Sequence, residues 1–150
     1  MRLISHRGNI NGRFESYENE PRYIDNAIEK GYDVEVDVWY VGNNLYLGHD
    51  NPQYCVTIDF FGKRITKLWI HCKNIEALMF FKNHKEIGQY THYFWHQKDD
   101  VTLTSFNFFW TYPGKPLYED SICVMPETVK QDIPDNIHGI CSDYIEKYRD

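Results

Sequence analysis

The sequence lacks any run of 18 apolar residues, and its first residues lack the apolar stretch of a secretory signal. From these two absences we expect a cytoplasmic protein without a membrane span. It also lacks a C-x-x-C pair, because Cys55, Cys72, Cys123 and Cys141 are widely separated. This spacing argues against a zinc ribbon or a dithiol redox motif and predicts reduced, mostly buried thiols.

Positively charged residues are fewer than negatively charged ones, with 16 Lys and Arg against 22 Asp and Glu and a formal net charge of −6. Proteins that bind nucleic acid through its phosphates need a basic face, so the composition argues against nucleic acid as a partner. Repeats and low-complexity tracts are absent, and 42% of the residues are apolar. The composition predicts a single globular domain over residues 1–150 and leaves its oligomeric state open.

Hydrophobic periodicity predicts an alternation of strands and helices, which is typical of parallel βαβ units. The expected strands are 3–6, 33–41, 45–48, 67–73, 93–96, 101–112, 121–125 and 139–142. Helices are expected from about Pro21 to Gly31, from about Asn74 to Lys85 and, as a short one, from Pro126. A β/α barrel takes about 31 residues per unit, so the chain has room for about five of eight units. The helix-poor stretch after about residue 90 predicts where the shortening falls.

The strand at 33–41 alternates strictly, with Val34, Val36 and Val38 on one face and Glu35 and Asp37 on the other. In an open sheet the acidic face could simply meet water. In a barrel the same face is enclosed, and two ionised carboxylates there need a cation or basic partners. Oxygen ligands of this kind suit Mg²⁺ or Ca²⁺.

Two histidines stand at the ends of expected strands, His6 before Arg7 and His49 before Asp50. A histidine at a strand end is often structural or exposed. In a β/α barrel, however, the carboxyl ends of the strands form the active face. Two imidazoles there could act as general base and general acid, or one as nucleophile, and Arg7 offers a fork for a phosphate.

Five short motifs in this order resemble the N-terminal signature of the glycerophosphodiester phosphodiesterases over residues 3–50. They are His6-Arg7-Gly8, Glu18-Asn19, Ala27 to Gly31, Glu35-x-Asp37 and Gly48-His49-Asp50. The resemblance implies a β/α-barrel fold and metal-dependent hydrolysis of a phosphodiester. The related phospholipases D of spider venom share the two-histidine, Glu-x-Asp arrangement, so a lipid substrate also stays open.

Carried over by position, the resemblance makes His6 and His49 the catalytic pair. Glu35 and Asp37 become metal ligands, and Arg7 contacts the phosphate. Glu18 and Asn19 would lie in the loop beside the first catalytic histidine.

Beyond residue 50 the match thins. Where the family has a third ligand glutamate in an E-x-K element, this sequence has His71, and it keeps Lys73. An imidazole is a softer ligand and removes one negative charge, so Mg²⁺, Mn²⁺ or Zn²⁺ become as plausible as Ca²⁺. Alternatively, His71 is a strand histidine bonded to a neighbouring carboxylate. Lys73 on the same face could stabilise phosphate charge. Residues 139–144 resemble the family's last strand, expected beside 3–6.

Aromatic residues make up 17% of the chain and concentrate at 94–95 and 106–112. We expect them to pack in the core, with stacking on a nucleobase or sugar as the alternative. His96 and the residues up to Asp100 are predicted to form a polar turn or a solvated loop, and His84, His92 and His138 to lie on the surface.

Together these features predict an α/β fold, a compact, shortened or incomplete TIM-type β/α barrel with helices trimmed in the C-terminal half. The predicted activity is metal-dependent hydrolysis of a small glycerophosphodiester-like substrate by a two-histidine acid/base mechanism. The predicted cofactor is a divalent cation on Glu35, Asp37 and His71, with Mg²⁺ or Ca²⁺ first and Mn²⁺ or Zn²⁺ as alternatives. The rival hypothesis is a non-catalytic barrel relic that binds phosphate or metal.

Overall fold

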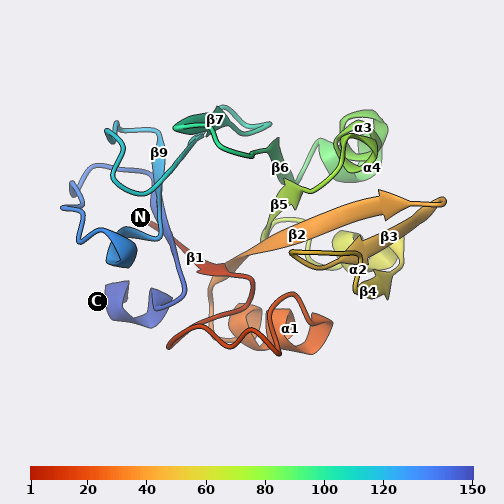
Figure 1. Ribbon diagram of the computed structural model, residues 1–150, viewed down its shortest axis with the longest axis horizontal. Helices are drawn as coiled ribbons and strands as arrows, with labels where there is room; N and C mark the ends of the chain where they lie inside the picture. Colours follow the sequence, from red (N-terminus) through yellow and green to blue (C-terminus); the bar gives the residue numbers. More distant parts are fainter.

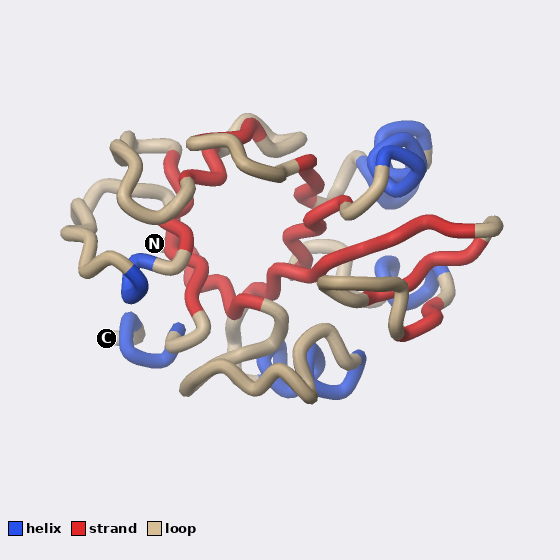
Figure 2. Tube along the Cα trace, in the orientation of Figure 1, coloured by secondary structure: helices blue, strands red, loops and turns tan.

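A computed structural model describes all residues, Met1–Asp150, as an α/β fold built on one curled, mixed sheet (Figures 1 and 2). The strands are β1 (Arg2–His6), β2 (Asp33–Val41), β3 (Asn44–Leu47), β4 (Tyr54–Val56), β5 (Leu68–Cys72), β6 (His92–Trp95), β7 (Val101–Leu103), β8 (Phe109–Thr111), β9 (Ser121–Val124) and β10 (Gly139–Ser142). The helices are α1 (Pro21–Glu29), α2 (Ile58–Gly62), α3 (Ile75–Asn83), α4 (Lys85–Gly88) and the 3₁₀ turns η1 (Pro126–Thr128) and η2 (Ile145–Tyr148).

Eight strands follow the curve in the order β6-β5-β2-β1-β10-β9-β8-β7 and form a half-barrel. All neighbours are parallel except β7, which is antiparallel to β8. The first and last strands are adjacent, as expected, with Leu3 opposite Ile140. The far end of β2 leaves the curve and continues into the antiparallel strands β3 and β4.

The two ends of the curled sheet, β6 and β7, are not paired as strands, but hydrogen bonds connect them. The backbone N–H of Ser105 donates to the carbonyl of Tyr93 at 2.9 Å. The hydroxyl of Thr102 donates to the carbonyl of Trp95 at 2.8 Å. The two ends of the curled sheet therefore lie next to each other.

The α-helices lie outside the curve and belong to the first part of the chain, as Figure 2 shows. Helix α1 buries Ile24 and Ala27, and α3 buries Ala77 and Phe81. After Gly88 only the two 3₁₀ turns remain, so the trimming of helices in the C-terminal half is confirmed. No helix is long and apolar enough to cross a membrane.

The curl divides the core in two. Outside it, Val34, Val36 and Val38 pack under the helices in the larger cluster. Inside it lies a smaller cluster made of Ile4, Trp69, Phe94, Trp110, Ile122, Val124 and Cys141. Glu35 and Asp37 face this interior and are 2% and 0% exposed. Their burial rules out the solvated-strand interpretation of the acidic face.

Several local expectations were wrong. The stretch 101–112 is not one strand but the hairpin β7–β8, because Thr104 bonds back to Phe108 around Asn107, whose φ is 65°. Strand β4 and helix α2 were not predicted, and the helix at Pro126 is a single 3₁₀ turn. The thiols are free, as expected, with Cys55 alone exposed.

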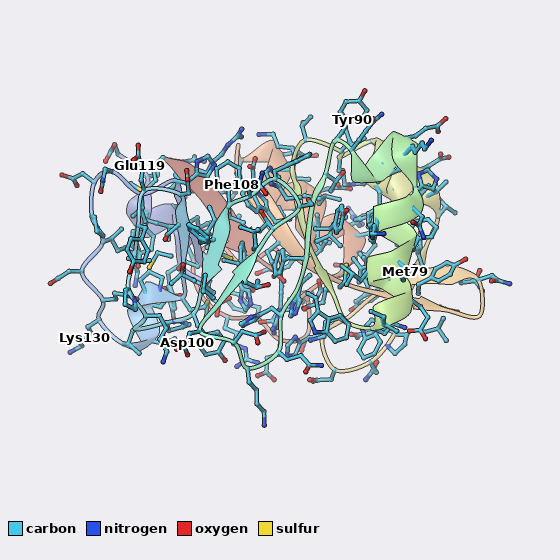
Figure 3. All side chains as sticks on the ribbon, turned by 90° about the horizontal axis from the view of Figure 1, so that it is seen from above. Met79, Tyr90, Asp100, Phe108, Glu119 and Lys130 are labelled. Atoms are coloured by element: carbon cyan, nitrogen blue, oxygen red, sulfur yellow. The ribbon has the colours of Figure 1, made fainter.

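The interior is filled at the end opposite the carboxyl ends of the parallel strands. There the rings of His92 and Trp69 stack with centroids 3.7 Å apart, and so do those of His138 and Phe108. The expectation that both histidines lie free on the surface is therefore wrong, since π-stacking holds them in this plug. In Figure 3, Tyr90, Phe108 and Glu119 lie towards one end of the molecule, and Asp100 and Lys130 towards the other.

Candidate functional site

The polar side chains predicted from the sequence meet at the carboxyl ends of β1, β2 and β5. They surround a cavity of about 780 Å³. Its lining includes His6, Arg7, Glu35, His49, His71 and Lys73. Asp37 lies directly behind them and is in contact with four of these residues. All seven predicted site residues are therefore brought together.

Asp37 is held from several sides. The side-chain amide of Asn19 donates to its Oδ2 at 2.9 Å, and the Asn19 carbonyl oxygen accepts the backbone N–H of Asp37 at 2.9 Å. Arg7 Nε lies 3.0 Å from the same Oδ2. Burial alone would raise the pKa of Asp37, but the contacts with His49 and His71 and the charge of Arg7 hold it well below its usual value. Asp37 is therefore an ionised carboxylate in a fixed orientation.

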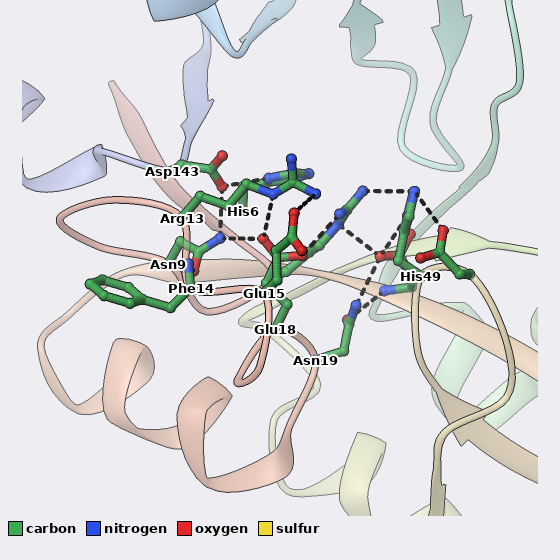
Figure 4. Close-up of polar contacts among 12 residues, drawn as sticks. His6, Asn9, Arg13, Phe14, Glu15, Glu18, Asn19, His49 and Asp143 are labelled. Atoms are coloured by element: carbon green, nitrogen blue, oxygen red, sulfur yellow. Dashed lines mark hydrogen bonds and ion pairs between the residues drawn. The ribbon is translucent and has the colours of Figure 1, made fainter.

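Arg7 is placed by an unusual backbone. Its φ is 56°, and Gly8 follows at 94°, where a Cβ would come within 2.6 Å of the Tyr23 ring. Arg7 as a whole is 8% exposed, and its guanidinium turns inward and donates to Glu18 at 3.1 Å. Glu18 also accepts from the amide of Asn9 at 3.0 Å (Figure 4). This network explains the Glu18-Asn19 motif, because Glu18 fixes Arg7 and Asn19 fixes Asp37.

His6 is oriented by the last strand. Its Nδ1 lies 2.7 Å from Oδ1 of Asp143, the residue directly after β10. Contacts with His6 and Asn9 keep the pKa of Asp143 below its usual value, although burial opposes them. A carboxylate only accepts, so Nδ1 carries the hydrogen. The lone pair of His6 Nε2 is therefore left facing the cavity, 3.9 Å from Glu35.

His49 has a matching arrangement on the other side of Asp37. Arg7 donates to its Nε2 at 3.3 Å, and its Nδ1 lies 3.3 Å from Asp37 Oδ2. The hydrogen is thus on Nδ1, and Nε2 is the acceptor. Gly48 makes the position possible, since its φ is 147° and a Cβ would meet the Asn51 carbonyl at 2.2 Å. His49 is also the more open of the two rings, with 38% of its side chain exposed.

His71 approaches both acids of β2. Its Nδ1 lies 3.0 Å from Asp37 Oδ1 and 3.8 Å from Glu35 Oε1. Its Nε2 is 2.8 Å from the carbonyl of His96, which can only accept, so Nε2 carries a hydrogen. Three basic atoms, one from each residue, then lie within 4.8 Å of one another. Such a cluster requires a proton or a metal cation between its members.

Glu35 is the least satisfied member. Oε2 of Glu35 is buried without a hydrogen bond, and so is Oδ1 of Asp37. Burial and the neighbouring charge of Asp37 raise the pKa of Glu35 well above its usual value, although Arg7 and Lys73 oppose the shift. By contrast Asp33, the third acid on this face, is paired with Lys67 at 3.2 Å. The amino group of Lys73 lies 3.8 Å from Asp37 Oδ1.

The other side of the cavity is largely apolar and comes from the later strands. It is formed by Trp95, Trp110, Tyr112, Pro113, Val124, Met125 and Val129. His96 stands between the two sides, with its side chain 7% exposed. Its Nδ1 lies 3.6 Å from Oδ2 of Asp99, and neither ring nitrogen makes a hydrogen bond. The expected solvated loop is therefore wrong at His96, because its ring packs beside Tyr112 and His71.

Sequence reasoning gave no role to five polar residues of this site: Asn9, Glu18, Asn19, His96 and Asp143. Three lay within motifs named above, Glu18 and Asn19 together and Asp143 in the last-strand pattern, but their contacts depend on the fold. No signal marked Asn9 or His96. A search of protein-family models, curated proteins and solved structures finds no match to this chain.

Proposed function

We propose that the protein is a metal-dependent phosphodiesterase on a short TIM-type β/α barrel, as the resemblance to glycerophosphodiester phosphodiesterases implies. The observation that carries the proposal is the meeting of His71 Nδ1 with the carboxylates of Glu35 and Asp37. The adjacent cavity has two histidines and two cationic side chains in its wall, as phosphodiester chemistry requires.

The three residues fit a divalent cation. Their ligand atoms converge, two buried carboxylate oxygens lack a hydrogen bond, and the Nε2 hydrogen bond of His71 leaves Nδ1 as the ligand atom. Two carboxylates and one imidazole suit Mg²⁺, Mn²⁺ and Zn²⁺ as well as Ca²⁺. When bound, such a cation would supply charge neutralisation for a non-bridging phosphate oxygen.

The side chains around the cation have distinct parts to play. Arg7 and Lys73 add positive charge at the polar end of the cavity. His6, with its Nδ1 hydrogen held by Asp143, offers Nε2 as nucleophile or general base. His49 stands on the open side; once its Nε2 has taken up a proton in place of the Arg7 contact, it can deliver that proton to the leaving alkoxide, while Asp37 holds the Nδ1 hydrogen.

Hydrolysis assays with and without EDTA test the proposal. Substrates are bis-p-nitrophenyl phosphate, glycerophosphodiesters, lysophospholipids and cyclic nucleotides, each with Mg²⁺, Ca²⁺, Mn²⁺ or Zn²⁺ added. We expect turnover that requires a metal and is lost in His6→Ala and His49→Ala, while His84→Ala, outside the cavity, keeps it. Turnover that survives both site substitutions would remove the assignment. Metal binding without turnover on any substrate would favour a non-catalytic binding module.

A further inference from the structure

The lining of the cavity divides into two parts, which come from different halves of the chain. The polar part comes from residues in and directly after β1, β2 and β5 and from His49 in the loop after β3. It accounts for the phosphate, the cation and the proton transfers proposed above. The other part comes from the residues at and after β6, β8 and β9. Nothing in the proposed hydrolysis uses this second part, although it faces the same space.

Aromatic rings dominate the second part. Trp95 ends β6, and Trp110 and Tyr112 lie in and just after β8. Trp110 is stacked on Phe94 with centroids 4.6 Å apart and is 4% exposed, so it belongs to the fixed core behind the cavity. Tyr112 is different, because 45% of it is exposed at the mouth. A large aromatic surface exposed at the rim of a cavity is a site for a flat apolar group.

His96 supplies a polar group in this aromatic part. Its side chain is almost completely buried. Nδ1 lies 3.6 Å from Oδ2 of Asp99, beyond hydrogen-bond distance, and Nε2 has no polar partner, which is uncommon for a buried polar side chain. Its ring lies 5.1 Å from that of Tyr112 and 6.0 Å from that of His71, measured between centroids. The rings of His71, His96 and Tyr112 thus form a continuous row from the acidic cluster to the mouth.

The backbone after β9 is shaped to complete the same wall. Met125 lines the cavity with φ at 49°, a left-handed conformation that a residue with a Cβ rarely adopts. Its N–H is bonded to the carbonyl of Cys141 at 2.8 Å, which holds this turn against β10. Strained backbone of this kind is concentrated at ligand sites, and here it adds a flexible apolar side chain that packs against the cluster containing Trp110.

From these observations we infer that the substrate carries an aromatic ring on one ester oxygen of its phosphate. The ring lies against Tyr112 and Trp95, with any hydrogen-bonding edge towards His96, while the phosphate occupies the polar end. This inference rests on the proposed function and specifies its substrate class. A simple aryl ester and a nucleoside ester share this chemistry, and the experiment separates them.

Binding of phosphate monoesters to the metal-loaded protein, measured by calorimetry, tests the inference without requiring turnover. Phenyl phosphate is compared with cyclohexyl phosphate, which has similar size and apolarity but no flat ring. Adenosine 5′-monophosphate is compared with ribose 5-phosphate in the same way. Base or ring stacking on aromatic side chains corresponds to about tenfold in affinity, and we expect the ring-bearing probe of at least one pair to bind tighter by about this factor.

The variant Tyr112→Leu keeps an apolar side chain and removes the ring, so it should abolish most of that preference. Tyr118→Leu is the matched control, because Tyr118 is 67% exposed and lies outside the cavity lining, and it should keep the preference. A preference in the phenyl pair alone indicates an aryl ester. A preference in the nucleotide pair indicates a nucleoside ester.

Equal binding within both pairs, or a preference that Tyr112→Leu leaves intact, would overturn the inference. Hydrolysis of glycerophosphodiesters without any preference for aromatic probes would refute it and leave the proposed function standing. A preference for aromatic probes in a protein that hydrolyses no phosphodiester would refute the proposed hydrolysis and leave the aromatic binding site standing.

Discussion

His6 Nδ1 lies 2.7 Å from Asp143 Oδ1, so the residue that ends the first strand is fixed by the residue that follows the last. The parallel pairing of β1 with β10 brings the two together. A histidine whose Nδ1 hydrogen is held by a carboxylate presents Nε2 in a fixed direction, and the carboxylate stabilises the imidazolium that forms. The proposed catalysis therefore depends on a contact between the first and the last strand of the sheet.

Replacing Asp143, the carboxylate that orients His6, should slow hydrolysis without loss of metal binding. In Asp143→Asn the amide can turn its NH₂ group towards His6 and favour the wrong tautomer, so we expect the rate to fall by about 10²–10⁴-fold. The measurement is the pH profile of kcat/KM, with metal affinity determined in parallel. The exposed Asp135→Asn is the control. An unchanged rate and pH profile in Asp143→Asn would contradict an orienting role for this carboxylate.

Glu35→Gln should stabilise the metal-free protein. The raised pKa of Glu35 means that the metal-free protein loses stability as the pH rises above the usual glutamate value and the buried group is forced to ionise. The neutral amide removes this loss, so the melting temperature at pH 8 should rise, by about 3 °C for each 1 kcal/mol. Added metal should raise the melting temperature of the wild type and have little effect on the variant. Exposed Glu86→Gln is the control. A variant that melts lower without metal would contradict the prediction.

Asn19 should matter through both its backbone and its amide. Its φ is 63°, and its side chain makes two hydrogen bonds with Asp37 in a fully buried position. Asn19→Gly keeps the backbone conformation and loses the bonds, whereas Asn19→Ala loses the bonds and adds strain. We expect losses of about 2 kcal/mol for Gly and about 3 kcal/mol for Ala, measured by urea unfolding. Equal stability of the alanine variant and the wild type would show that the two hydrogen bonds contribute nothing.

His92, in the stacked rings that fill the other end of the interior, should make the free energy of unfolding depend on pH. Burial, with the nearby charges of Arg2 and His138, lowers the pKa of His92 to about 4. The unfolded state takes up this proton first, so His92 costs stability as the pH falls from about 6.5 towards 4, by up to roughly 3 kcal/mol.

His92→Phe keeps a ring to stack on Trp69 and removes the titration. Urea unfolding at pH 7.5, 6, 5 and 4.5 should therefore show a shallower fall in stability for this variant than for the wild type. An equal fall in the free energy of unfolding with falling pH in the two proteins would contradict the lowered pKa of His92.

Features that depend on neighbours in the chain could be predicted from the sequence, whereas features that depend on contacts between distant residues could not. Strand β2 was predicted to the residue, because Val34, Val36 and Val38 alternate with acids from Asp33 to Val38 and β-prone residues continue to Val41. The hairpin β7–β8 was missed because its turn contains neither glycine nor proline, and Asn107 alone marks it. His96 and His92 were assigned to solvent because a histidine carries no periodic signal, and only neighbours from other strands bury it.

The sequence alone indicated which chemistry the protein could hold: the two strand-end histidines, the Glu-x-Asp pair, and the pair His71 and Lys73 on a later strand. These features are local, since spacing within a strand decides which side chains share a face. The tertiary structure decided which of them meet. It buried the acidic face inside the curl, turned Arg7 inward onto Glu18 and Asp37, and set Asp143 against His6. It also placed an aromatic wall across from the acids. These contacts join residues up to 137 positions apart, and they follow from how the sheet curls and sets β10 beside β1.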